Sequence, residues 1–291
     1  MKFGVREICD VVFKAKGSGN LGSMPYNAGQ PVLYIDSAKA STMESSSTTV
    51  YAQGGKGNAR LIAWEGEKTL TFTVEDALLS PIGFAILSGA GLLTATQEVT
   101  TVKVHYTSKA HMDAKGVIDL SDALEGNEEI CGVAPVFVMV RDADDSLTGE
   151  MLDGFTITNE GKSLSKEGVT EAKDVFVDFY VAKDIANVHD LTIDAGSFAG
   201  NWYVEASTLF RRQADGKDLP AEITFPNVKI QSNFTFSMAA TGDPSTFTFT
   251  MDALPGKVQG TDKNVLCAIQ IVEDEIVKEA GSATGHDSLA D

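Results

Sequence analysis

The first stretch whose residues could do chemistry is the glycine-rich run 54–57, which reads GGKG. A phosphate-binding loop has the pattern GxxxxGK[ST] between a strand and a helix, so that backbone amides and the helix N-terminus face the phosphate. Here Gly57 stands where Ser or Thr is required, and a strand-like run follows. The pattern therefore predicts a hairpin loop, with Lys56 at its tip available to a neighbouring subunit.

The second stretch is acidic and contains Asp142, Asp144, Asp145 and Glu150. An EF-hand calcium loop needs Gly at its sixth position and Glu at its twelfth, between two helices. Counted from Asp142, the sixth position holds leucine and the twelfth aspartate. An acidic, hydrated turn is the main interpretation, and a calcium site stays open as the alternative.

The histidines and cysteines give no catalytic or metal-binding pattern. Neither HExxH nor GxSxG occurs in the sequence, and His105 lies in a strand pattern. The three cysteines, Cys9, Cys131 and Cys267, are far apart, which is typical of buried reduced thiols. We therefore expect no enzyme activity, no metal and no cofactor.

The elements that must position any functional surface are strands. Phenylalanine and methionine alternate with threonine and serine in two runs, 234–238 and 246–251, separated by a Gly-Asp-Pro-Ser turn at 242–245. Alternation with a period of two sends one set of side chains to each face of a strand. We expect two antiparallel strands with an aromatic inner face and a hydroxyl outer face that suits solvent or a flat contact with another subunit. The run 69–74 repeats the pattern.

Further strands and one helix complete the predicted architecture. Ser80 is a good N-cap, Pro81 suits the first helical position and Gly89 suits the end, while residues 75–76 could open a preceding helical turn. Strands are expected at 31–35, 50–52, 61–64, 117–120, 136–140 (covered on both sides) and 174–182. Many short strands with one short helix predict an all-β sandwich or barrel-like fold.

Composition and charge limit the classes of function. The chain has 291 residues, of which 43% are apolar, and its formal net charge is -18. Residues 105–199 hold seven basic and nineteen acidic residues. An acidic surface repels phosphate, which argues against ordinary nucleic-acid binding but allows DNA to slide past. The N-terminal run has no export-signal pattern, so we expect synthesis and folding in the cytoplasm.

The expected organisation has four parts. Residues 1–104 and 200–277 form the two halves of one β domain, and residues 105–199 form an acidic β-rich elaboration or insertion. We favour an elaborated part of the same architecture over a separate domain. Residues 278–291 are expected to be a flexible tail.

A family resemblance appears at residues 200–206, which read GNWYVEA. These are followed in order by Arg211-Arg212, by DGKD at 215–218, by ITFP at 223–226 and by GDPS at 242–245. The series resembles the C-terminal pattern of tail tube (major tail) proteins of large contractile-tailed bacteriophages. The strands, glycine-rich hairpin and short helix of residues 50–87 resemble the N-terminal half of that family, whereas the acidic middle third departs from its compact subunits.

The resemblance implies a structural virion protein whose β-sandwich subunits form hexameric rings that stack into a hollow tube. It also implies sheath, baseplate and tape-measure proteins as partners, and DNA that passes through the lumen without specific binding. Candidate inter-subunit contacts are Lys56, Asn58, Arg60, Arg211, Arg212 and Asp243. Candidate residues of an acidic lumen or surface are Asp142, Asp144, Asp145 and Glu150. Arg211 and Arg212 also suit a strand-end charge pair with neighbouring acids. The alternative function is a calcium-assisted carbohydrate-binding or adhesin-type β module.

Overall fold

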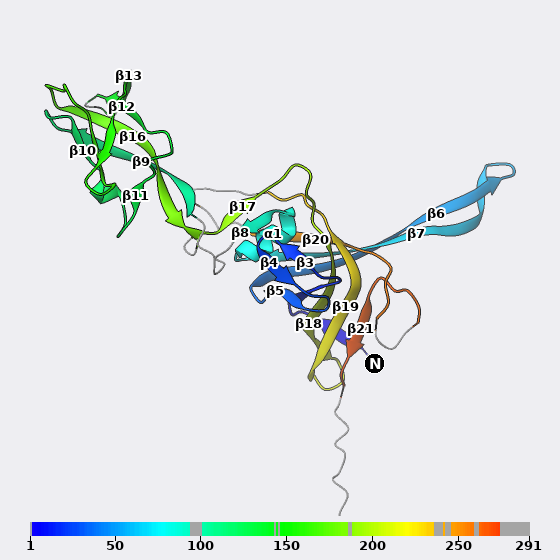
Figure 1. The fold of residues 1–291 in the computed structure, drawn as a ribbon. Coiled ribbons are helices and arrows are strands. Elements are labelled where there is room, and N and C mark those ends of the chain that lie inside the picture. The colour runs from blue at the N-terminus through cyan, green and yellow to red at the C-terminus, as the bar shows by residue number, and fades with distance from the viewer. Residues whose placement is uncertain are drawn as a thin grey trace, which may run out of the picture. The chain divides into compact units, whose positions relative to one another are not determined.

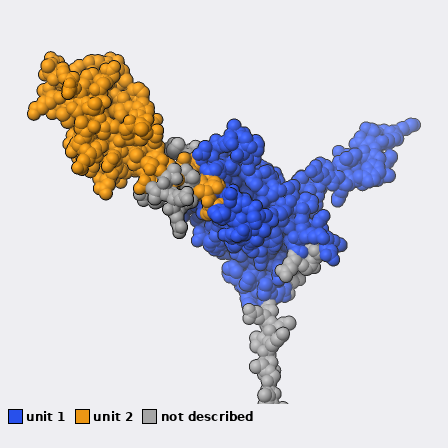
Figure 2. Space-filling view, in the orientation of Figure 1, with its two compact units in different colours: residues 1–21, 25–91, 192–291 blue, residues 22–24, 92–191 orange. Residues whose placement is uncertain are grey.

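The computed structural model divides the chain into two compact units. Unit 1 comprises residues 1–21, 25–91 and 192–291, and unit 2 comprises residues 22–24 and 92–191 (Figure 2). The described residues are 2–93, 101–142, 144, 146–185, 188–235, 241, 246–258 and 262–273. The acidic region expected at 105–199 thus falls mainly in unit 2, and the tail expected at 278–291 lies outside the described residues.

Unit 1 is built on one nine-stranded antiparallel sheet (Figure 1). Its strand order is β5-β2-β18-β19-β20-β7-β6, and in addition β1 pairs with β18 and β21 with β19. The bounds are β1 Phe3–Val5, β2 Asp10–Ala15, β5 Pro31–Ile35, β6 Ala38–Gly54, β7 Ala59–Asp76, β18 Asn201–Arg212, β19 Asp218–Ile230, β20 Phe247–Ala253 and β21 Ala268–Ile271. Strands β5 and β6 end this order on opposite sides, yet only two residues join them, so the sheet must curl back on itself.

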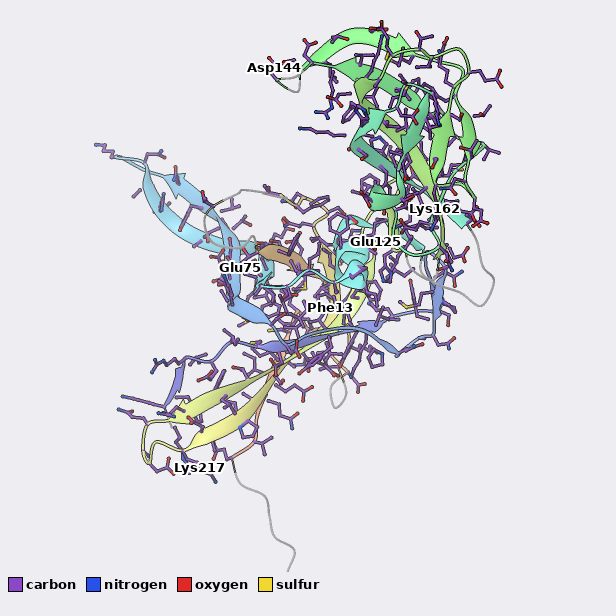
Figure 3. The ribbon with its side chains drawn as sticks, turned by 90° about the vertical axis from the view of Figure 1, so that its left-hand side faces the viewer. Phe13, Glu75, Glu125, Asp144, Lys162 and Lys217 are labelled. Atoms are coloured by element: carbon purple, nitrogen blue, oxygen red, sulfur yellow. The ribbon has the colours of Figure 1, made fainter. Side chains whose placement is uncertain are left out.

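The curled sheet encloses an aromatic core. Phe13 on β2 and Phe249 on β20 lie 5.9 Å apart by ring centroids, although two strands separate them in the sheet. Phe72 on β7 stacks on Phe225 of β19 at 4.8 Å. All four side chains are at most 2% exposed. Figure 3 labels Phe13 in the middle of this unit. These contacts confirm the all-β, barrel-like prediction.

Helix α1, Pro81–Ser88, begins and ends as its sequence predicts. The Ser80 side chain accepts a hydrogen bond of 2.9 Å from the Gly83 amide, and Gly89 adopts the left-handed conformation with φ 72°. A Cβ on Gly83 would lie 3.5 Å from the Phe249 ring. The helix therefore covers the aromatic core, and it leaves no helical turn at residues 75–76, which close β7 instead.

The strand expected at 234–238 is wrong where it can be checked. Residues 231–235 belong to no strand, and 236–238 and the turn 242–245 lie outside the described residues. Strand β20 does form as predicted, with Phe247, Phe249 and Met251 buried, but its partners are β19 and β7. Phe234 instead meets the Phe84 ring of α1 edge-on at 5.1 Å. An aromatic side chain at position 234 is thus accounted for by its contact with the helix, without a strand at this position.

Unit 2 contains an eight-stranded antiparallel sheet in the order β13-β12-β16-β9-β10-β15-β14, with β11 on β16. The bounds are β9 Thr101–Met112, β10 Val117–Asp119, the 3-10 turn η1 Ser121–Ala123, β11 Glu129–Ile130, β12 Phe137–Arg141, β13 Leu147–Leu152, β14 Thr156–Thr158, β15 Ser163–Ser165 and β16 Lys173–Asp184. Two further sheets have two strands each. One pairs β3 Gly19–Leu21 with β4 Met24–Tyr26, and the other pairs β8 Gly91–Leu93 with β17 Asp190–Thr192.

The core of unit 2 uses one face of this sheet. On β16, Val175, Val177, Phe179 and Val181 are fully buried, while the residues between them are not. Strand β12 was expected to be covered on both sides, but Phe137 is 47% exposed, so that expectation is wrong. Because unit 2 has a single core, its strands alternate in burial even where their sequence is continuously apolar.

No helix among the described residues is long and apolar enough to cross a membrane.

Candidate assembly surface

The most exposed element of unit 1 is the hairpin formed by β6 and β7, which we call the arm. Its strands pair from Ala38↔Asp76 to Gly54↔Ala59. The part from Ser46 to Thr69, which we call the outer arm, reaches away from the rest of unit 1 (Figure 1). No residue of β6 beyond Ala38 is buried, and none of β7 before Leu70. A two-stranded hairpin standing alone in water is marginally stable at best. The outer arm is therefore expected to need a partner surface.

The outer arm carries an exposed apolar patch of Val50, Leu61, Ile62 and Trp64, which are 54–66% exposed. Val50 lies opposite Trp64, and Ala52 opposite Ile62. Directly opposed residues share a face of the hairpin, so the patch lies mainly on one face. Contiguous apolar residues of this kind mark interaction sites. The sequence predicted these strands but not the exposure of the patch.

Lys56, Asn58 and Arg60, predicted from the sequence as inter-subunit contacts, all lie at the tip of the arm. The turn 55–58 has positive φ at Gly55, Gly57 and Asn58, and the Asn58 amide donates 3.2 Å to the Gly55 carbonyl. The Arg60 guanidinium lies 4.2 Å from the centre of the Tyr51 ring. This confirms the hairpin loop and places two basic residues at the end of the arm.

Arg211 and Arg212 lie at the far end of the β18–β19 hairpin, where Figure 3 labels Lys217 in the turn. Arg211 binds Asp218 through two hydrogen bonds of 2.5 and 2.6 Å. Arg212 forms the same kind of double contact with Asp215, and this contact lowers the pKa of Asp215 to about 2. The strand-end charge pairs predicted from sequence are thus present, while Asp243 lies outside the described residues.

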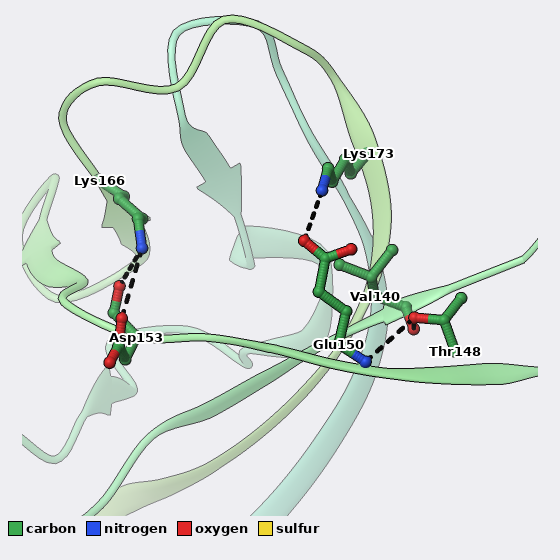
Figure 4. A network of polar contacts seen from close by, with 6 residues as sticks. All are labelled: Val140, Thr148, Glu150, Asp153, Lys166 and Lys173. Carbon is green, nitrogen blue, oxygen red and sulfur yellow. Dashed lines mark hydrogen bonds and ion pairs between the residues drawn. The ribbon is translucent and has the colours of Figure 1, made fainter.

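The acidic loop joins β12 to β13 in unit 2. The Asp142 amide donates to the Ser146 carbonyl at 2.8 Å, and Asp144 Oδ1 accepts from the Ser146 amide at 3.2 Å. The Glu150 carboxylate binds Lys173 Nζ at 2.6 Å (Figure 4). Glu150 is thus engaged with a lysine, and Asp145 lies outside the described residues.

In the described part of the chain, no group of three or more His, Cys, Asp or Glu side chains could hold a metal ion. His105 Nε2 lies 2.9 Å from Asp178 Oδ2, and His111 Nδ1 lies 2.8 Å from Asp174 Oδ1. The hydrogen bond from His111 lowers the pKa of Asp174. His105 and His111 on β9 thus each contact one carboxylate of the neighbouring strand β16.

The cysteines are free, with Cys9 and Cys131 buried and Cys267 partly buried. Burial raises the pKa of Cys9 and of Cys267. A raised pKa keeps a thiol protonated and unreactive. The thiols of Cys9 and Cys267 are therefore poor nucleophiles.

Comparison with known proteins relates the chain to a family of tube proteins. A search of curated proteins finds no match. A family model described as "YomU/Tube protein family" matches residues 24–266, a range that runs through strands of both units and includes the whole arm. The family name indicates a phage-derived structural, tube-like protein. Because the match spans well over half of the sequence, the chain belongs to the YomU/Tube protein family.

Proposed function

We propose that this chain is the subunit of the tail tube of a contractile-tailed phage, and that its copies form hexameric rings that stack into a hollow tube. The observation that carries the proposal is the arm, whose apolar patch is 54–66% exposed in the single chain. A patch of this kind on an extended hairpin suits burial against a second copy. Family membership supports a structural tube protein as the general class.

The edge of the sheet supports self-assembly as well. Strand β6 ends the strand order of unit 1 and, among the described residues, pairs only with β7. Natural proteins protect long edge strands with proline, charged side chains or bulges. The 17 residues of β6 contain no proline, and Lys39 and Glu44 are their only charged side chains. Register shifts interrupt the pairing of β6 with β7 at three places, but a regularly paired stretch from Ala40 to Ser47 remains between two of them. Pairing or covering this edge in a closed ring would remove the aggregation hazard.

The proposal assigns partners and a location to the assembled tube. The tube contacts sheath and baseplate proteins, holds a tape-measure protein during assembly and conducts DNA without binding it specifically. The protein is assembled in the host cytoplasm and belongs to the virion tail. In the proposed tube, Asp142, Asp144 and Asp145 between β12 and β13, together with Glu150 on β13, belong to the acidic lumen or to the outer surface. A lumen lined with acids would repel DNA phosphates and so favour passage.

Electron microscopy of the purified chain tests the proposal. The expected result is rings or tubes of uniform diameter whose abundance rises with protein concentration. A matched variant removes residues 50–64 and joins Thr49 to Glu65, which are paired across the hairpin, through an Asn-Gly turn. This variant should fold, with a circular dichroism spectrum still dominated by β structure, and remain monomeric. A wild-type chain that stays monomeric at high concentration would refute the proposal.

A further inference from the structure

A groove of about 490 Å³ crosses the outer face of the unit 1 sheet, away from the arm in sequence. One row of its floor comes from four strands. Ser207 on β18 lies opposite Asp10 on β2 and opposite Glu222 on β19, and Glu222 lies opposite Gln270 on β21. Opposed residues share one face of a sheet. The register therefore places the Asp10 and Glu222 carboxylates in the same groove.

The neighbouring row of the groove is apolar. Leu209 lies opposite Pro220, and the Val272 amide donates 2.9 Å to the Pro220 carbonyl. Ile8, Leu209 and Val272 are 40–45% exposed. The groove thus combines open apolar walls with an acidic row, and Glu7 also lines it.

The tip of the arm has the complementary character. From Val50 to Trp64 the only charged residues are Lys56 and Arg60, and both are basic. In the described part of the chain, neither forms an ion pair with a carboxylate. Beside them lies the apolar patch of the arm, more than half exposed. Basic and apolar groups on one extended hairpin match the acidic and apolar rows of the groove.

We propose that the tip of the arm of one copy docks in this groove on another copy. The inference rests on the proposed function and names the surface that receives the arm. Apolar contacts with Ile8, Leu209 and Val272 supply burial, while Lys56 and Arg60 face the carboxylates of Asp10 and Glu222. Two different patches of one chain then meet head to tail, and such a contact closes into a ring or continues along a stack. Salt should weaken it.

Charge reversal tests the pairing. Arg60→Glu and Glu222→Arg should each raise the concentration needed for half-maximal assembly about tenfold, and the double variant should restore it towards the wild-type value, as expected for directly coupled interfacial charges. Lys115→Glu and Glu167→Arg are matched controls, because they make the same charge changes at exposed residues of unit 2. Single variants that assemble as the wild type does, or a double variant as weak as the sum of the singles, would overturn the inference.

Cysteine trapping supplies a second measurement that does not depend on assembly strength. In a Cys267→Ser background, which removes the least buried thiol, Arg60→Cys with Glu222→Cys should give a ladder of disulfide-linked oligomers from assembled particles. Arg60→Cys with Glu167→Cys is the control and should give none. Assembly without the ladder would overturn the groove assignment and leave the proposed function intact. A wild-type chain that never assembles would overturn both.

Discussion

Replacing Trp64 by alanine separates assembly from folding. In the single chain the Trp64 side chain is 54% exposed on the outer arm. Full burial of a tryptophan removes at most about 250 Å² from water, so about 130 Å² would remain to be buried by a neighbouring copy. At about 25 cal/mol per Å², this contact is worth about 3 kcal/mol. Since each 1.4 kcal/mol is about a tenfold change in an equilibrium constant, Trp64→Ala should raise the concentration for half-maximal assembly about 100-fold.

The same substitution should hardly change the stability of the folded monomer, because substitutions at exposed positions usually change the free energy of unfolding by less than about 0.5 kcal/mol. Sedimentation velocity over a concentration series measures assembly, and differential scanning calorimetry of dilute protein measures folding. Phe137→Ala is a suitable control, since that aromatic side chain is 47% exposed in unit 2. The reasoning is refuted if Trp64→Ala assembles like the wild type, or if it destabilises the monomer by several kcal/mol.

Three further predictions concern folding and pH. Phe179→Ala should destabilise unit 2 by about 3–5 kcal/mol, because the side chain is fully buried; calorimetry should show it in a unit 2 transition, and an unchanged thermogram would contradict it. Gly89→Ala should lower the melting temperature, because φ is 72° and the added Cβ would lie 2.4 Å from the Phe198 carbonyl carbon; a variant as stable as wild type would show that this geometry is wrong. The pKa of Asp215 is lowered from 3.8 to about 2, first by the hydrogen bond from Arg212 and then by the Lys217 amide. Its stabilisation is therefore complete above pH 4 and is lost as the pH falls towards 2. NMR titration should find the midpoint near 2 in wild type and at a higher pH in Arg212→Gln, and equal midpoints would exclude Arg212 as the main cause.

Local patterns were sufficient for much of the fold. Ser80 and the left-handed Gly89 stand at the two ends of α1. Their effect depends only on neighbouring residues, so it can be predicted from the local sequence. The glycine-rich turn of the arm is equally local. Alternation in β20 predicted its buried face correctly. It did not predict the neighbours of β20, because the same alternation is compatible with any partner strand that offers a hydrophobic face.

Exposure of the outer arm could have been suspected from the serine- and threonine-rich run 41–49, which gives a strand no apolar face for a core. The patch at Val50, Ile62 and Trp64 nevertheless reads like an ordinary buried strand pair in the sequence. Whether such residues are covered depends on whether another layer of the chain packs on them. Because the hydrophobic effect is non-directional, a local pattern of apolar residues does not reveal which surface, if any, will cover them.

By itself, the sequence determined the all-β class, the helix capped by Ser80, and the glycine-rich turn of the arm with Lys56, Asn58 and Arg60 beside it. It left open whether Arg211 and Arg212 contact another subunit or pair with neighbouring acids. Only the tertiary structure decided that the sheet curls so that Phe13 meets Phe249, and that the outer part of the arm has no buried residues. It alone brought Asp10, Ser207, Glu222 and Gln270 into one row. Strand pairing joins residues about two hundred positions apart, and the register that aligns them is set by the packing of the whole sheet.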